Sequence, residues 1–84
     1  LGKYNTYVEK ETSQGRIDFV LECPDYVYIF EFKLNSTAEA ALKQIDEKGY
    51  VQPYASDKRK IYKVGISFSS ETGTVNDFAY KPRL

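Results

Sequence analysis

Two segments decide the fold of this chain: GRIDFVLE at residues 15–22 and VYIFEFK at residues 27–33. Both are rich in β-branched and aromatic residues, so we expect two neighbouring strands. The second segment is apolar on both faces up to Phe30, which is typical of a strand covered on both sides. Glu31 and Lys33 then place two charges on one face, because strand side chains alternate with a period of two. Charges at the end of a buried strand are costly unless they are paired or bind a metal, so they mark a candidate site.

Outward from these segments, the sequence predicts three further strands. Polar and aromatic residues over 4–11 predict an exposed strand, which the turn at 12–15 joins to residues 16–22 as a hairpin. Strands are also expected over residues 61–69 and 74–80. On the first of these two, the alternation predicts a buried side made of Tyr62, Val64, Ile66 and Phe68.

The residue spacing changes to a helical period after residue 34. Ser36 and Glu39 have the spacing of a capping box, and Gly49 is a natural stop. Between them runs a narrow apolar stripe at helical spacing, made of Ala38, Ala41, Leu42 and Ile45. A short helical turn is expected around Pro53. The helix allows a parallel crossover between strands three and four. We therefore predict a small mixed α/β sheet with one main helix and the element order β-β-β-α-β-β.

Composition narrows the class of protein. The chain has 84 residues, enough for a single domain over residues 1–84. Twelve basic and twelve acidic residues give a net charge of zero, which argues against strong non-specific nucleic-acid binding but allows a local basic strip. Histidine is absent and Cys23 is the one cysteine, which argues against a structural zinc site and favours a reducing, cytoplasmic setting. Without Met or a membrane-length apolar run, the chain is expected to be part of a longer protein and to have no membrane span.

The loop near Pro24 predicts which carboxylates meet across the sheet. If residues 16–22 and 26–33 pair in antiparallel fashion, Asp18 lies opposite Glu31, with Cβ atoms roughly 5 Å apart. Two carboxylates at that distance repel, and a divalent cation such as Mg²⁺ removes the repulsion. Lys33 could then polarise a bound water or neutralise a phosphate. The alternative is a structural ion-pair cluster without chemistry.

Around these residues the sequence resembles the PD-(D/E)XK nuclease superfamily. The resemblance covers residues 11 to about 78 and begins with GRID at 15–18 and IFEFK at 29–33. It continues through ALKQI at 41–45, KGY at 48–50 and GISFS at 65–69. More narrowly, the pattern is similar to the nuclease-like domain at the C-terminal end of certain bacterial AAA-ATPase-like proteins. The implied fold is a restriction-endonuclease-like core.

The resemblance also implies roles for individual residues. Asp18 and Glu31 would hold Mg²⁺ or Mn²⁺ together with the backbone carbonyl of Phe32, and Lys33 would position the attacking water. Gln44 would look into the site, although a solvated helix residue is the alternative. Members of the superfamily often carry an acidic residue on a helix before the first strand. This chain starts too late for that helix, so a fragment lacking an N-terminal helix is expected.

These features lead to two main functional hypotheses and a weaker third. The first is metal-dependent hydrolysis of nucleic acid, with DNA preferred to RNA. The second is a non-catalytic module that binds nucleic acid or protein within a larger ATPase-like protein, and the third is a purely structural domain. An exposed aromatic edge would allow a homodimer. Candidate phosphate contacts, each with a salt bridge or a solvated edge as its alternative, are Arg16, Lys58, Arg59 and Lys60.

Overall fold

The computed structural model describes residues 5–12 and 15–83, with side chains from residue 19 onward. Within these residues, five strands and one main helix follow the predicted order, and one 3₁₀ turn, η1 (Gln52–Tyr54), contains Pro53 as expected. The helix α1 spans Ala38–Glu47. The strands are β1 (Asn5–Thr12), β2 (Gly15–Glu22), β3 (Tyr26–Leu34), β4 (Lys60–Phe68) and β5 (Val75–Pro82).

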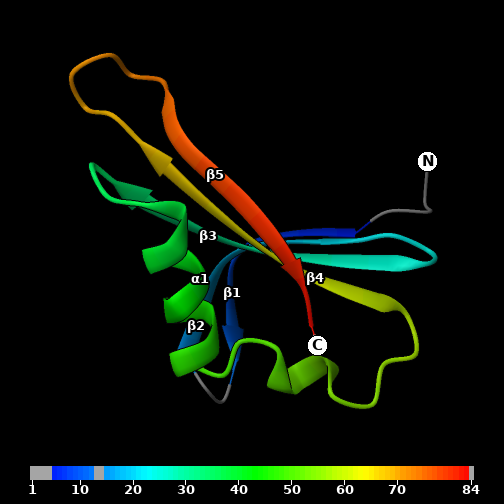
Figure 1. The fold of residues 1–84 in the computed structure, drawn as a ribbon. Coiled ribbons are helices and arrows are strands. Elements are labelled where there is room, and N and C mark those ends of the chain that lie inside the picture. The colour runs from blue at the N-terminus through cyan, green and yellow to red at the C-terminus, as the bar shows by residue number, and fades with distance from the viewer. Residues whose placement is uncertain (1–4, 13–14, 84) are drawn as a thin grey trace.

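The strands form one twisted sheet in the order β1-β2-β3-β4-β5, with α1 lying against one of its faces (Figure 1). β3 and β4 run parallel, and the other neighbouring pairs are antiparallel. The helix is the crossover between the two parallel strands, because a connection between parallel neighbours must return along the sheet. This confirms the predicted small mixed α/β sheet with one main helix, and it is consistent with the restriction-endonuclease-like core that the resemblance implies.

The helix begins one residue later than the capping-box spacing indicates. Thr37 is the N-cap, and its Oγ1 accepts a hydrogen bond from the backbone N–H of Ala40 at 3.0 Å. Ser36 instead donates its backbone N–H to Ser67 Oγ on β4 at 2.9 Å, so it holds the entry to the helix against the sheet. The predicted cap at Ser36 is therefore wrong. The predicted stop is confirmed: Gly49 has a φ of 67° and follows the last turn.

The core lies between α1, η1 and the sheet. Its fully or almost fully buried members are Val20, Val27, Ile29, Leu42, Ile45, Tyr50, Tyr54 and Ile61. The helix approaches β4 closely because Gly65 has no side chain: a Cβ there would lie 2.5 Å from the carbonyl oxygen of Ala38. The small stripe residues Ala38 and Ala41 allow the same approach from the helix side.

The predicted buried side of β4 is wrong for most of its length. The residues facing α1 have odd numbers, namely Ile61, Lys63, Gly65 and Ser67, and all four are buried. Of the even-numbered residues only Val64 is buried, and Tyr62, Ile66 and Phe68 are half-buried on the opposite face. The expectation failed because most of the large apolar side chains of β4 occupy its even-numbered positions, whereas the helix covers the odd-numbered positions. Hydrophobicity therefore indicated the wrong face of the strand.

We call that opposite surface the aromatic face. Its rings form two series of contacts, with neighbouring centroids 5.3–6.3 Å apart. One series runs through phenylalanines of β2, β3 and β4, and the other joins tyrosines of β3, β4 and β5 with Phe78. In the described part of the chain no helix covers it (Figure 1). The aromatic face consists of Phe19, Tyr26, Tyr28, Phe30, Phe32, Tyr62, Phe68, Phe78 and Tyr80.

Candidate active site

The predicted polar residues of β3 and α1 meet on the helix-covered face of the sheet. Glu31 is buried, with 4% of its surface exposed, and its Oε2 accepts a hydrogen bond from Gln44 Nε2 at 2.7 Å. The same amide group accepts a hydrogen bond from Lys33 Nζ through Gln44 Oε1. Gln44 therefore bridges the carboxylate and the ammonium, which come from positions two residues apart on one strand. Gln44 is half-buried and its side chain lies at the site, while its role in catalysis stays a prediction.

Glu31 and Lys33 lie on the same side of β3 because strand side chains alternate between the two faces of the sheet. Residues 29, 31 and 33 point from β3 toward the helix, and Ile29 at the buried end is fully enclosed. Lys33, near the strand end, is half-buried. Gln44 lies one residue before Ile45 of the apolar stripe, so it stands at the margin of the stripe. The site therefore has the buried Glu31 carboxylate on its inner side and the Lys33 ammonium closer to solvent.

Asp18 is the predicted partner of Glu31, and its side chain lies outside the described residues. The backbone register is described, and it pairs Phe19 with Phe30 and Val20 with Ile29 in antiparallel fashion. Continued by one residue, this register sets position 18 opposite position 31. The pairing of the two carboxylates stays a prediction, as does the metal-binding role of the Phe32 carbonyl. The Phe32 ring belongs to the aromatic face.

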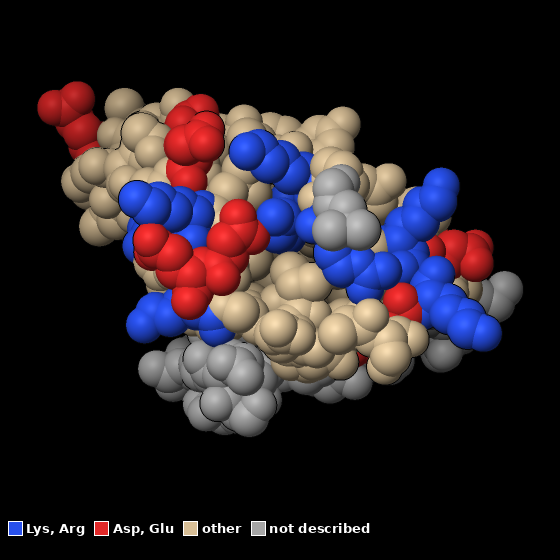
Figure 2. Space-filling view, turned by 60° about the horizontal axis from the view of Figure 1, so that its bottom comes forward, with Lys and Arg blue, Asp and Glu red and all other residues tan. Residues whose placement is uncertain are grey.

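Among the four predicted phosphate contacts, Lys58 and Lys60 are exposed near the start of β4. Arg16 lies on β2, with its side chain outside the described residues. Seen from the side shown in Figure 2, basic and acidic residues are intermixed rather than gathered into one basic track. The surface seen there matches the balanced composition of the chain.

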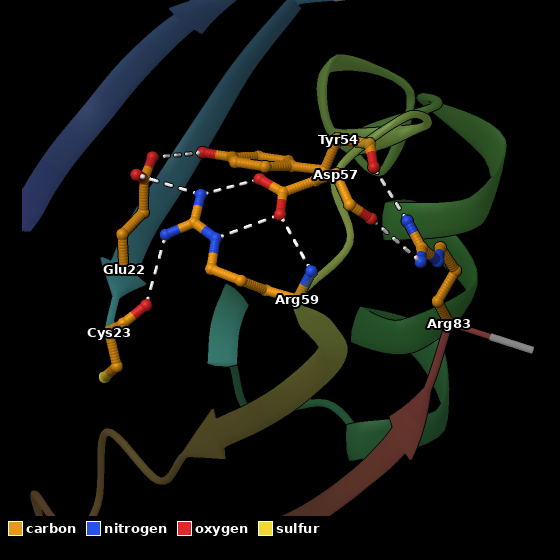
Figure 3. A network of polar contacts seen from close by, with 6 residues as sticks. All are labelled: Glu22, Cys23, Tyr54, Asp57, Arg59 and Arg83. Atoms are coloured by element: carbon orange, nitrogen blue, oxygen red, sulfur yellow. Dashed lines mark hydrogen bonds and ion pairs between the residues drawn. The ribbon is translucent and has the colours of Figure 1, made fainter. Parts of the chain in front are cut away.

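Arg59, the middle residue of the basic run Lys58-Arg59-Lys60, is held in a polar network (Figure 3). Its guanidinium donates to Asp57 Oδ1 at 2.9 Å and Asp57 Oδ2 at 2.6 Å, and to the backbone carbonyl of Cys23 at 3.2 Å. A longer ion pair of 3.4 Å joins it to Glu22. Hydrogen bonds from Arg59 lower the pKa of Asp57 to about 2. Arg59 thus connects the loop before β4 to the end of β2, and its predicted contact with phosphate stays a prediction.

Three further hydrogen bonds complete this network, and the sequence did not predict them. The Tyr54 hydroxyl donates to Glu22 Oε2 at 2.9 Å. Arg83 donates to the backbone carbonyl of Tyr54 at 2.7 Å and, at 3.4 Å, to that of Asp57 (Figure 3). The Asp57-x-Arg59 spacing is a local signal for the contact between these two residues, because short polar side chains such as Asp often accept hydrogen bonds from the backbone two residues later. The partners on β2 and after β5 had no local signal.

Lys63 lies on the buried side of β4, although the alternation of apolar residues predicted it on the exposed side. It is 8% exposed on the helix-covered face, where its Nζ forms a 2.7 Å ion pair with Asp46 of α1. Asp46 itself is 58% exposed at the side chain, so the pair sits at the edge of the core. A lysine stem can lie along apolar surface while its ammonium reaches a partner. Lys63 and Asp46 therefore fasten the C-terminal end of α1 to β4.

The donor chemistry of the site fits a hard divalent cation. Glu31 supplies carboxylate oxygens, the ligand type that Mg²⁺ prefers, and the neighbouring groups are an amide and an ammonium rather than thiols or imidazoles. In the residues with described side chains, no three Asp, Glu, His or Cys residues gather as a ready metal cage. This is compatible with Mg²⁺, which is usually held by one or two carboxylates plus waters and substrate phosphates.

The fold and the polar bridge on β3 therefore define a restriction-endonuclease-like domain with a carboxylate–lysine site. A family model described as the PD-(D/E)XK nuclease superfamily matches residues 1–78, and the chain belongs to this superfamily. Nucleases of this class generally use divalent metals. Within the described residues no helix is long and apolar enough to cross a membrane.

One curated relative extends this comparison. The chain is 37% identical over 73 residues to the "Uncharacterized protein in vnfD 5'region" of Azotobacter chroococcum mcd 1. The alignment covers 84% of this chain and 14% of that protein, so the chain spans about a seventh of the relative's length. No solved structure matches the chain.

Proposed function

We propose that this domain hydrolyses phosphodiester bonds of DNA with the help of Mg²⁺ or Mn²⁺. The observation that carries the proposal is the Gln44 bridge, which holds the buried Glu31 carboxylate and the Lys33 ammonium on one face of β3. A buried, oriented carboxylate next to a cation is what a metal-assisted displacement at phosphorus requires. The superfamily match over residues 1–78 supports the same assignment.

Each residue of the site has a distinct task in this proposal. Glu31, with Asp18 from the neighbouring strand and the Phe32 carbonyl, would hold the cation, which supplies Lewis-acid stabilisation of the phosphate charge. Lys33 would position the attacking water and offset negative charge on the phosphate. Gln44 would keep the carboxylate and the ammonium in register, because its amide contacts both. Burial of Glu31 lowers the local dielectric and strengthens these interactions.

Cleavage of labelled DNA, with Mg²⁺, Mn²⁺ or a chelator, tests the proposal. Glu31→Gln and Lys33→Ala are each expected to lower the cleavage rate about 100-fold or more, the usual scale for losing a positioned catalytic group. Glu47→Gln and Lys43→Ala are the matched controls, since this exposed pair lies on the outer side of α1. Cleavage that persists at the wild-type rate in both site variants would contradict the proposal. A matched RNA substrate tests the preference for DNA.

A second candidate function is a binding module within a larger ATPase-like protein. The observation favouring it is that the matched relative is about seven times longer than the aligned part. Such a module would bind DNA or protein without cleavage. It predicts a DNA affinity that falls steeply with salt and is unchanged by a chelator. The cleavage assay and this binding assay separate the two candidates.

A further inference from the structure

We infer that Glu9 of β1 is a third acidic ligand of the divalent-metal site, beside Asp18 and Glu31. The inference rests on the proposed function, because it concerns the same cation. The residues assigned to the site in that proposal come from β2, β3 and α1. Glu9 brings in β1, the strand next to β2 in the sheet.

The register of the sheet sets position 9 in line with the two other acidic positions. β1 and β2 pair in antiparallel fashion, with Val8 opposite Phe19 and, two residues on, Lys10 opposite Ile17. Position 9 is therefore opposite position 18, and the register of β2 with β3, continued by one residue, sets position 18 opposite position 31. The three acidic residues in this row across neighbouring strands are Glu9, Asp18 and Glu31.

The row belongs to the helix-covered face of the sheet. Glu31 is on that face, where it is buried and accepts the hydrogen bond from Gln44 of α1. On β2, Val20 is fully buried in the core on the same face, and strand alternation assigns position 18 to the side of position 20. Residues directly opposite each other on neighbouring strands share a face. Glu9 is therefore assigned to the face of the candidate active site and not to the aromatic face.

Three acidic residues side by side favour a cation among them. Residues directly opposite on one face have Cβ atoms about 4.5–5.5 Å apart, and like charges at that separation destabilise a sheet. The row also has the shorter acid in the middle, because Asp18 has one methylene fewer than the glutamates on its two sides. This order suits a cation above the middle strand. Mg²⁺ usually keeps several waters, so the outer glutamate can hold it directly or through one of them.

Glu11 offers a matched control on the same strand. It has the same charge as Glu9 and, by alternation, belongs to the same face. The register sets it opposite Arg16, however, and not opposite an acid. An acid opposite a base is stable without a metal, whereas an acid opposite an acid is not. The two glutamates of β1 are therefore expected to differ in their effect on metal binding.

Titration of the 84-residue chain with Mn²⁺, followed by calorimetry, tests the inference. Glu9→Gln is expected to raise the Kd for Mn²⁺ about 10- to 100-fold, the usual scale for losing a group that holds a metal or its ligands. Glu11→Gln should raise it less than about fivefold, the scale of a solvent-exposed charge interaction. Glu31→Gln is the reference variant for loss of the site. Circular dichroism checks that each variant folds.

Thermal unfolding distinguishes a metal ligand from a structural ion pair at Glu9. Without metal, Glu9→Gln should unfold at the wild-type temperature or above it, because it removes one of three neighbouring like charges. Added Mg²⁺ should raise the unfolding temperature of the wild type more than that of the variant, since a ligand stabilises the state that binds it. A variant that is less stable than wild type to the same extent with and without Mg²⁺ would contradict the inference.

Two outcomes of the titration would also overturn it, and they differ in what else they exclude. If the wild type binds Mn²⁺ and Glu31→Gln weakens that binding, but Glu9→Gln does not, the proposed metal site stands without Glu9. If the wild type binds neither Mn²⁺ nor Mg²⁺ and cleaves no DNA, the proposed function fails together with the inference.

Discussion

The two faces of this sheet differ in what they bury and in what they can do. The helix-covered face encloses Val20, Val27 and Ile29 together with polar groups that have partners, among them Lys63 and Ser67. The aromatic face carries larger apolar side chains, yet these are more exposed. The difference teaches that hydrophobicity alone does not select the buried face. The fit of a helix selects it, and here Gly65 and two alanines make that fit.

The sharpest test of this difference compares one deletion on each face. Ile29→Ala is expected to lower the free energy of unfolding by about 2–5 kcal/mol, because Ile29 is fully buried under α1. Phe78→Ala removes a larger side chain that is 57% exposed, and it should cost less than about 1 kcal/mol at low protein concentration. Urea unfolding measures both. Equal losses would mean that the aromatic face is already buried in solution.

The second test concerns the close packing of α1 against β4 at Gly65. Gly65→Ala is expected to cost about 1–3 kcal/mol, because the new Cβ would lie 2.5 Å from the backbone carbonyl of Ala38 and only a shift of α1 can relieve the clash. Chemical denaturation of the variant checks this value. Because Gln44 is carried by the same helix, its contact with Glu31 should also be disturbed. A variant as stable as wild type would show that the helix is not seated by Gly65.

The third test distinguishes the two candidate caps of α1. Thr37→Ala is expected to lower stability by about 1 kcal/mol, because the Ala40 N–H loses its acceptor. Ser36→Ala should change stability by less than about 0.5 kcal/mol, because the contact of Ser36 with β4 uses its backbone N–H. Thermal unfolding of both variants compares them directly. A larger loss for Ser36→Ala would restore the capping-box prediction.

The smallest expected effect is a pH dependence of the stability contributed by Asp57, in the loop before β4. Asp57 has a folded-state pKa of about 2, below the ordinary value of 3.8, because Arg59 donates hydrogen bonds to its carboxylate. The carboxylate therefore stabilises the folded state above about pH 4, and this contribution is lost as the pH falls toward 2. Asp57→Asn should remove it. The stability difference between wild type and variant, measured by unfolding from pH 7 to pH 2, should shrink over that window.

Much of the fold could be predicted because it depends on local patterns. The order of strands and helix along the chain, the stop of the helix at Gly49 and the turn around Pro53 all follow from periodicity and turn residues. The superfamily resemblance placed Gln44 at the site, and the structure adds its contacts with Glu31 and Lys33. Three features escaped prediction: the buried side of β4, the cap at Thr37 and the Arg59 network. The buried side of β4 and the distant partners of Arg59 depend on which element lies opposite, and no short segment encodes that. The cap at Thr37 is a local contact, but Ser36 and Thr37 are both good capping residues and the sequence pattern favoured the wrong one.

The sequence by itself determined the elements, their order and the placement of Glu31 and Lys33 on one side of β3, because strand alternation is a local property. Only the tertiary structure decided which side of the sheet the helix covers and where Arg59 and Lys63 find their partners. The physical reason is that close packing depends on the missing Cβ of Gly65 and on carboxylates brought from distant segments. These contacts form only when the chain has closed on itself.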